Sequence, residues 1–300
     1  MQREMDAVGD RRSSPLAIGG IGGSGTRVIA RLLLELGHDM GSDLNDSLDN
    51  LWFTLLFKRL EWLDPTNQAE FSLAIQIFGS IMAGGAPLGR QQKALIKRLA
   101  RERRAEHPSR WLQDRAATLR AATGQARSVR GWGWKEPNTH VFLRHFLAHW
   151  PAMRYIHVMR HGMDMALSAN QNQLMLWGSY FLGAVITDPT PRQSLAYWCE
   201  VHRRVLQTTQ GMHDRFLLLN YDEFCARPRE GLQKLLDFLK SPTKGKNLDR
   251  LTGLISVPES VGRYRNLAPE TFAPEDAAYV RTLGFPVEFV PLEIRPAAAE

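Results

Sequence analysis

The sequence predicts an α/β fold with a central parallel sheet, and three features of the chain support this. A short apolar run at residues 16–18 leads into a glycine-rich loop and then a helix-like stretch. Apolar β-type runs alternate with amphipathic stretches along the second half of the chain. The 300 residues are 44% hydrophobic and 23% charged, which is enough apolar material to bury a core. Alternating strands and helices form parallel sheets with right-handed crossovers.

The N-terminal part predicts a tail, a strand, a loop and a helix. Residues 1–14 are polar, so we expect a disordered tail followed by a single domain at 15–300. The run at 16–18 ends in glycines, as is typical of a buried parallel strand. Residues 28–36 have helical character, and Gly37 ends that helix.

Residues 47–125 predict a helical insertion within the domain. Leucines between 48 and 63 recur at the spacing of one helix with a buried face, and Asp64-Pro65 breaks it. A second helix is expected at 67–83. Between residues 90 and 130 there are twelve Lys or Arg against three acids. This basic stretch predicts one or two more helices, and it is either a solvated helical face or a rim that attracts an acidic acceptor.

The second half of the chain supplies most of the remaining strands. We expect strands at 131–135, 155–159 and 216–219, of which 155–159 has the clearest β pattern. Helices are expected from Met163, at 191–210 and at 229–240.

Charge and composition restrict the class of protein. The net charge of +7 favours anionic partners. The longest apolar stretch, residues 71–83, is shorter than the roughly 20 residues that a bilayer requires. Two cysteines, Cys199 and Cys225, predict no disulfide framework and fit a reducing compartment. No targeting segment stands out, so a cytoplasmic location is expected.

The loop at residues 19–25 contains five glycines and predicts a phosphate site. Glycines bring backbone N–H groups close to an anion, and the helix that begins near Thr26 adds its own N–H groups. Gly20 and Gly25 have the spacing of a Walker loop, but Thr26-Arg27 stands where Lys-Ser/Thr is needed. The hydroxyl that would hold Mg²⁺ is therefore missing, and we expect a phosphate site without a metal. The alternative is a glycine turn with no ligand.

A second anion site is expected around Arg160. This arginine follows the predicted strand at 155–159, where α/β folds bind ligands. Asp164 and Ser168 come four and eight residues later. The alternative for Arg160 is a structural ion pair.

Together these motifs resemble those of the sulfotransferases that use 3′-phosphoadenylyl sulfate (PAPS). Residues 22–27 resemble the family's loop for the 5′-phosphosulfate, and Arg160, Asp164 and Ser168 match its spacing for the 3′-phosphate. Three further segments resemble later family motifs, in the family's order: residues 134–137, 217–223 and 262–266. The resemblance spans about 19 to 266 and implies a P-loop-like three-layer fold.

The resemblance also implies which residues bind and react. Lys135, Arg27 and Asp43 are the expected catalytic residues: the two cations stabilise charge on the leaving oxygen, and Asp43 takes the proton of the acceptor. Glu136, Asp49 and His38 are the alternatives for that base, and a structural role for Asp43 is to cap a helix starting near Ser47. The residues expected to bind PAPS are Gly22, Gly23, Ser24, Gly25, Thr26, Arg27, Arg160, Ser168, Tyr221, Arg263, Tyr264 and Arg265.

Several positions depart from the family pattern. Gly23 stands where many members carry a cation, and Val28 stands where small-molecule enzymes stack an aromatic residue on adenine. Glu136-Pro137 replaces the Thr-His that supplies a histidine base. The chain therefore looks closer to the bacterial and the glycan- or peptide-modifying branches.

We therefore expect sulfuryl transfer from PAPS to a hydroxyl or amine, without a metal. The acceptor is a small molecule, a glycan or a peptide, and the positive charge is compatible with an acidic one; nucleic acid is not expected as a partner. Two other function classes stay open. One is a nucleotide-dependent kinase, and the other is a non-catalytic binder of acidic glycan or nucleic acid that uses the basic stretch.

Overall fold

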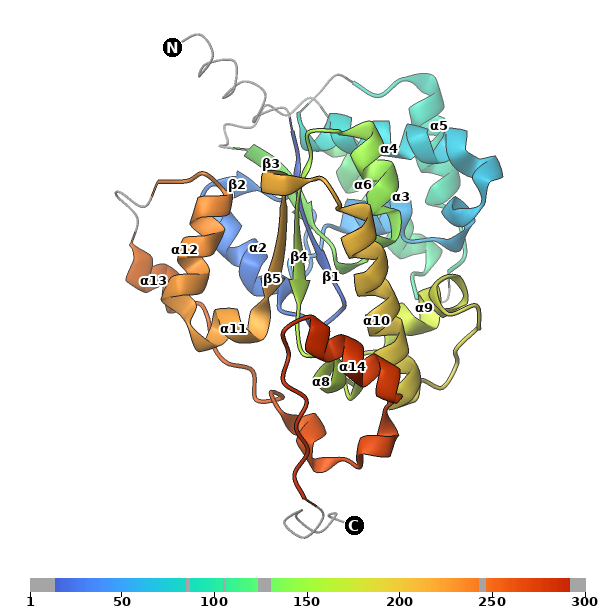
Figure 1. Cartoon of the computed structure of the whole chain (residues 1–300). Coiled ribbons are helices and arrows are strands. Elements are labelled where there is room, and N and C mark those ends of the chain that lie inside the picture. Colours follow the sequence, from blue (N-terminus) through green and yellow to red (C-terminus); the bar gives the residue numbers. More distant parts are fainter. Residues whose placement is uncertain (1–13, 85–86, 105, 124–130, 243–246, 292–300) are drawn as a thin grey trace. The chain divides into compact units, whose positions relative to one another are not determined.

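The computed structural model describes residues 14–84, 87–104, 106–123, 131–242 and 247–291. The expected tail before Ser14, and Arg127 and Arg130 of the basic stretch, lie outside these residues. Five strands form one sheet in the order β2-β3-β1-β4-β5 (Figure 1). Strand β3 runs parallel to both β1 and β2, with Ile18 opposite Lys135 and His38 opposite Gly131. The predicted α/β fold with a parallel sheet is confirmed.

The chain divides into two compact units. One comprises residues 1–19 and 26–156, and the other comprises residues 20–25 and 157–300. The glycine-rich loop thus belongs to the second unit, whereas the helix that follows it belongs to the first. The single domain at 15–300 and the insertion at 47–125 stay predictions.

The first unit is largely helical. Its elements are β1 (Leu16–Gly20), α2 (Thr26–Glu35), β2 (His38–Asp39), α3 (Leu51–Phe57), η1 (Leu60–Leu63), η2 (Pro65–Asn67), α4 (Gln68–Met82), α5 (Arg90–Leu99), α6 (Ser109–Ala121), β3 (Gly131–Lys135), η3 (Pro137–Phe142), α7 (Leu143–His149) and the first half of β4 (Arg154–Met159).

The single helix expected over 48–63 is wrong. Helix α3 ends at Phe57, and Arg59 has extended backbone angles before the short 3₁₀ helix η1. The reason is that Arg59 is buried: its guanidinium donates to Glu102 at 2.6 Å and also to the carbonyl of Leu55 at the end of α3. A buried charge needs such partners, so the chain turns here to provide them.

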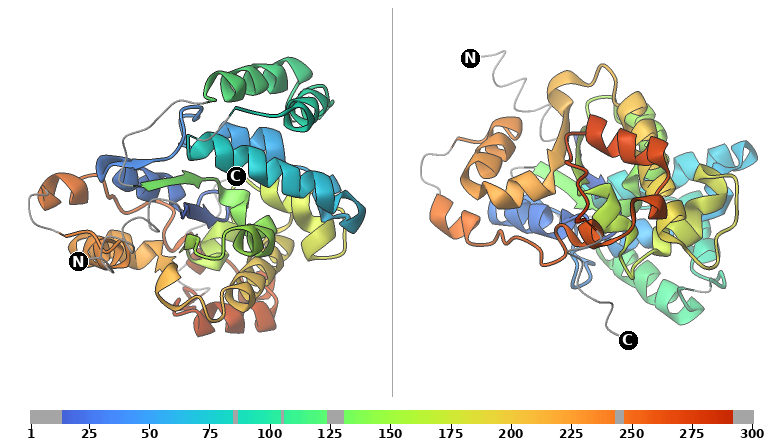
Figure 2. Two further views of the ribbon diagram at one scale, coloured as in Figure 1. Left: turned by 90° about the horizontal axis from the view of Figure 1, so that it is seen from above. Right: turned by 60° about the horizontal axis from the view of Figure 1, so that its bottom comes forward.

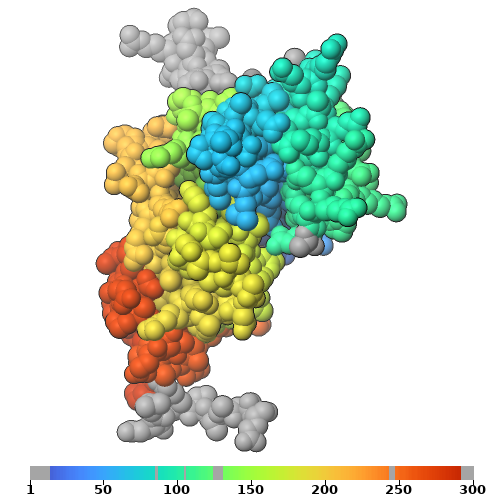
Figure 3. Space-filling view, turned by 90° about the vertical axis from the view of Figure 1, so that its right-hand side faces the viewer, coloured from blue at the N-terminus to red at the C-terminus, as the bar shows by residue number. Residues whose placement is uncertain are grey.

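An aromatic cluster holds the helices of the first unit together. Phe53 and Phe57 from α3 contact Phe78 of α4 and Phe146 of α7 with ring centroids 5.2–6.2 Å apart. Helices α5 and α6 lie side by side (Figures 1 and 2), and their outer side chains form a continuous teal surface (Figure 3). This surface carries most of the basic stretch.

The second unit contains the carboxyl end of β4 and the elements that follow it along the chain. Its elements are the rest of β4, α8 (Gly162–Ala166), α9 (Asn172–Phe181), α10 (Pro191–Thr208), η4 (His213–Arg215), β5 (Phe216–Asn220), α11 (Tyr221–Ala226), α12 (Pro228–Phe238), α13 (Leu248–Thr252), η5 (Arg263–Asn266), η6 (Pro269–Thr271) and α14 (Pro274–Thr282).

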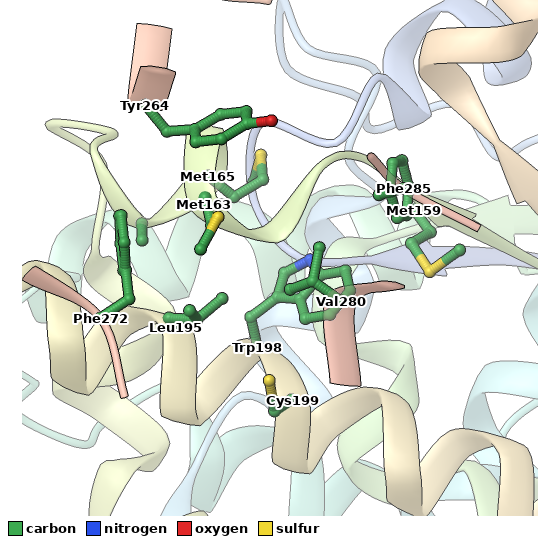
Figure 4. Close-up of a cluster of buried hydrophobic side chains, with 11 residues drawn as sticks. Met159, Met163, Met165, Leu195, Trp198, Cys199, Tyr264, Phe272, Val280 and Phe285 are labelled. Atoms are coloured by element: carbon green, nitrogen blue, oxygen red, sulfur yellow. The ribbon is translucent and has the colours of Figure 1, made fainter. Parts of the chain in front are cut away.

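A core of mixed aromatic and sulfur-containing side chains supports this unit. Helix α10 begins at a capping box between Thr190 and Gln193, and its buried face carries Leu195, Trp198 and Cys199. These side chains pack with residues of α8, η5 and α14 (Figure 4). Among the described residues, no helix combines the length and apolar character needed to cross a membrane.

Candidate functional site

The glycine loop of residues 20–25 adopts a conformation that requires glycine at two positions. Gly23 and Gly25 have φ angles of 88° and 94°, in the left-handed region that side chains disfavour. A Cβ atom on Gly25 would also lie 2.5 Å from the ring of Tyr221. The backbone N–H of Gly22 donates to the amide oxygen of Gln173 at 3.2 Å. Contacts on two sides therefore hold the loop in shape.

Ser24 supplies a buried hydroxyl that the protein does not use. Its side chain is only 1% exposed, and Oγ has no hydrogen-bond partner among the described residues. Buried polar groups are normally paired, so an unpaired one in a glycine loop points to a ligand oxygen. This observation fits the expected phosphate.

Arg160 joins the glycine loop to two other segments. It directly follows β4 and is buried. Its guanidinium donates to the carbonyl of Gly23 at 3.2 Å and to Oγ of Ser260 at 2.9 Å, and Nε lies 3.5 Å from the carboxylate of Asp222. The structural ion pair left open by the sequence is thus present, and it fixes Arg160 beside the loop.

Asp164 holds the segment at residues 262–266. Its carboxylate accepts hydrogen bonds from the backbone N–H groups of Gly262, at 2.7 Å, and Tyr264, at 3.1 Å. Its backbone carbonyl accepts from the guanidinium of Arg263 at 2.9 Å. Tyr264 stacks on His161 with ring centroids 4.3 Å apart. Asp164 therefore positions Arg263 and Tyr264, two of the three residues of this segment that were expected to bind nucleotide.

The other expected nucleotide-binding residues of the second unit differ in their surroundings. Tyr221 lies against Gly25, and burial raises the pKa of its hydroxyl, so it stays protonated. Ser168 accepts from the backbone N–H of Asn170 at 3.2 Å in the turn after α8. Arg265 lies 3.7 Å from the carboxylate of Glu288. Among the described residues, no hydrogen bond or ion pair joins Ser168 or Arg265 to Arg160.

In the first unit, Lys135 is buried against an acid. Its ammonium group contacts the carboxylate of Asp49 and donates to the carbonyl of Ser47 at 3.0 Å. Lys135 is only 2% exposed, so this pair lies largely out of water. Asp49 was expected only as an alternative base, and its pairing with Lys135 has no local sequence signal.

Glu136, the next residue, is fully buried. Burial, reinforced by the negative charge of Asp49, raises the pKa of its carboxyl to about 7. The carboxyl oxygens accept hydrogen bonds from the backbone and side-chain N–H groups of Asn138, at 2.6 and 2.8 Å. Glu136 thus caps η3 with a carboxyl group whose pKa is raised.

Asp43 is held by helix α6. Its carboxylate accepts from Arg115 at 3.0 Å and from the hydroxyl of Thr118. The interpretation of Asp43 as a helix cap is wrong, because α3 begins at Leu51 and its cap is Asn50. Arg115 and Thr118 were not expected near Asp43, since 72 or more residues separate them along the chain.

The remaining residues of the expected set lie at the start of α2. Thr26 is buried and Arg27 is exposed to solvent. No group of three or more His, Cys, Asp or Glu that could hold a metal ion occurs in the part of the chain that the structure describes.

A family model described as the sulfotransferase family matches residues 15–245, well over half of the chain. This chain belongs to the sulfotransferase family. The resemblance inferred from the motifs is thereby confirmed. No curated protein matches this sulfotransferase.

Solved structures that resemble this sulfotransferase are distant. Sulfotransferase STF9 from Mycobacterium avium is 17% identical, with 96% of this chain and 81% of that chain covered and a TM-score of 0.48. The sulfotransferase domain from the curacin biosynthetic pathway is 16% identical, with coverage of 91% and 98% and a TM-score of 0.49. Retinol dehydratase, solved with androsterone and the inactive cofactor PAP, is 13% identical, with coverage of 90% and 70% and a TM-score of 0.35.

Proposed function

We propose that this sulfotransferase moves a sulfuryl group from PAPS to a hydroxyl or amine of a small molecule, glycan or peptide. The observation that carries the proposal is the meeting of the glycine loop with Arg160 in one unit. A loop of backbone donors with a spare buried hydroxyl, next to a fixed guanidinium, is suited to a ligand with two anionic groups.

The proposed binding roles follow from these contacts. Backbone N–H groups of the loop, with Ser24 and Thr26, hold the 5′-phosphate, and Arg27 adds a cation. Arg160 binds the 3′-phosphate together with Ser168. Tyr221 and the segment at 262–266, with Arg263, Tyr264 and Arg265, lie over the nucleoside.

The proposed chemistry is an in-line transfer. The acceptor oxygen or nitrogen forms a bond to sulfur while the bond from sulfur to the 5′-phosphate oxygen breaks, and PAP (3′-phosphoadenosine 5′-phosphate) leaves. Lys135 and Arg27 stabilise the charge that develops on the departing oxygen. Asp43 accepts the proton of the acceptor. Such catalysis consists mainly of alignment and charge stabilisation, for which fixed cations are suited.

The pairing of Lys135 with Asp49 gives that acid a part in the proposal. Asp49 balances the charge of Lys135 in a buried place, where an unpaired ammonium group would be costly. Phosphate oxygens would compete with Asp49 for the same ammonium group. Asp49 is therefore proposed as a positioning residue for Lys135.

A comparison of nucleotides tests the proposed function. We expect PAP to raise the melting temperature more than AMP does, because only PAP carries the 3′-phosphate for Arg160. ATP with Mg²⁺ should stabilise less than PAP, and its shift should not depend on EDTA. Equal shifts from PAP and AMP would contradict the second anion site. A larger shift from ATP with Mg²⁺, lost in EDTA, would favour the kinase.

A further inference from the structure

A small pocket lies beside the glycine loop in the second unit, and apart from Gly22 its wall lies outside the motifs expected to bind PAPS. Its wall combines Ile21 and Gly22 of the loop with Gln173 and Leu174 of α9 and with residues of α10. The pocket itself has a volume of about 10 Å³, which is close to the minimum that holds one water molecule. When the open space at its mouth is included, the volume is about 310 Å³.

Three residues from one turn of α10 line this pocket, and each carries a buried polar group. The groups are the hydroxyls of Ser194 and Tyr197 and the indole N–H of Trp198. The three residues are 5%, 2% and 1% exposed, and none of these groups has a hydrogen-bond partner among the described residues. Their spacing of i, i+3 and i+4 places them on one face of the helix. Figure 4 shows the indole nitrogen of Trp198 turned away from Cys199.

Three unpaired groups on one turn of α10 are suited to a partner that the pocket can hold. A buried donor or acceptor without a partner costs a folded protein more free energy than a hydrogen bond contributes, so even one such group is rare. The indole N–H can only donate, and the two hydroxyls can donate or accept. Burial raises the pKa of the Tyr197 hydroxyl, so it keeps its proton. The partner must therefore offer an oxygen that accepts.

The rest of the wall restricts the charge and shape of that partner. Within the part of the chain that the structure describes, no Lys, Arg, Asp or Glu lines the pocket. A charged group would consequently lie there without a counter-ion. Ile21, Met165 and Leu174 form an apolar wall beside the polar turn. A neutral oxygen on or near an apolar body matches this lining.

We propose that the turn of Ser194, Tyr197 and Trp198 is a binding site for one neutral oxygen, supplied by a water molecule or by the hydroxyl of a small alcohol. The site goes beyond the proposed function, because it requires neither nucleotide nor sulfuryl transfer. The oxygen would lie beside Gln173, which holds the N–H of Gly22, and would thus help to support the glycine loop from below.

Removing one hydroxyl tests whether the oxygen is bound in the protein alone. With a bound water, Tyr197→Phe and Ser194→Ala should each lower the folding equilibrium constant about fivefold in urea unfolding, because the water loses a hydrogen bond. Tyr180→Phe is the matched control, since Tyr180 is 41% exposed, and it should change the constant little. If the groups were unpaired, Tyr197→Phe would instead stabilise the protein.

A pair of aromatic probes distinguishes the two sources of oxygen. Phenol and fluorobenzene have similar bodies, but only phenol carries a hydroxyl. An alcohol site predicts a larger thermal shift with phenol than with fluorobenzene in the wild type, and no such difference in Tyr197→Phe. This result would assign the site to an alcohol even if the α10 variants do not change the stability of the protein without ligand. The proposal is overturned if both α10 variants are at least as stable as the wild type and phenol acts no differently from fluorobenzene.

Discussion

Lys135 and three acids of the first unit are the residues on which the proposed chemistry depends. Asp49 pairs with the ammonium group, Glu136 is buried with a raised pKa, and Asp43 is bound by α6. Three carboxyl groups thus have three different surroundings, and only one of them can act as the proposed base.

Substitution of each acid separates these roles. We expect Asp43→Asn to lower turnover about 100-fold or more while PAP still raises the melting temperature as in the wild type, because a base acts on the acceptor and not on the nucleotide. Transfer of labelled sulfate from PAPS measures the turnover.

Variants of Asp49 and Glu136, with Asp46 as the control, complete the comparison of the acids. Asp49→Asn should lower turnover, since Lys135 loses the partner that positions it, but it should not weaken PAP binding, because Asp49 no longer competes with the phosphate for the ammonium group. Asp46→Asn changes an exposed acid of the same segment and should have no effect. If Glu136→Gln lost activity and Asp43→Asn retained it, the base would be Glu136.

Arg160 carries the proposed second anion site. We expect Arg160→Ala to weaken PAP binding about 10- to 100-fold, because a hydrogen bond to a charged group contributes about 1.5–3 kcal/mol. Binding of AMP, which lacks the 3′-phosphate, should change less. Calorimetric titration measures both. Arg227→Ala, at an exposed arginine of the same unit, is the control; unchanged PAP binding in Arg160→Ala would remove this residue from the site.

At the scale of elements, the glycine loop depends on the start of α11. Gly25 has a φ of 94° and lies against the Tyr221 ring, whereas Gly183 has a φ of 70° and open space around it. We expect Gly183→Ala to cost about 1 kcal/mol of unfolding free energy, from backbone conformation alone.

Gly25→Ala should cost more than Gly183→Ala, because Tyr221 must also move. It should abolish the thermal shift with PAP, while Gly183→Ala should leave that shift intact. Urea unfolding and a PAP titration on both variants check this. Equal effects of the two substitutions would show that the contact with Tyr221 does not shape the loop.

The ionisation of Glu136 should make the whole molecule less stable as the pH rises toward 7. Its carboxyl has a pKa of about 7 in the folded protein and an ordinary value of 4.5. Between these values the folded state binds more protons than the unfolded state, so the free energy of unfolding falls as pH increases. The contribution lost by pH 7 is on the order of 3 kcal/mol.

Urea unfolding between pH 4.5 and 8 measures this slope. Glu136→Gln cannot ionise and should show a shallower fall than the wild type, with the larger difference near pH 7. Glu270→Gln, at an exposed position, should follow the wild type. Parallel curves for the wild type and Glu136→Gln would mean that Glu136 is ionised in the folded protein.

Local patterns in the sequence were sufficient for the order of the main elements. The strands at 131–135, 154–159 and 216–220 and the long helix α10 were predicted within one or two residues. Apolar periodicity and turn residues act over a few positions, so they can be read from the chain directly. Strand β2 and helix α11 were missed, because two residues carry no period and α11 follows β5 without a break.

Partners far apart along the chain were decided only by the tertiary structure. The sequence by itself determined the family, the glycine loop and the position of Arg160 after its strand. Burial and pairing determined the rest: Asp43 meets α6, Asp49 meets Lys135, and three α10 residues with unpaired polar groups line one pocket. Such contacts depend on which surfaces are removed from water together, and no short stretch of sequence records that.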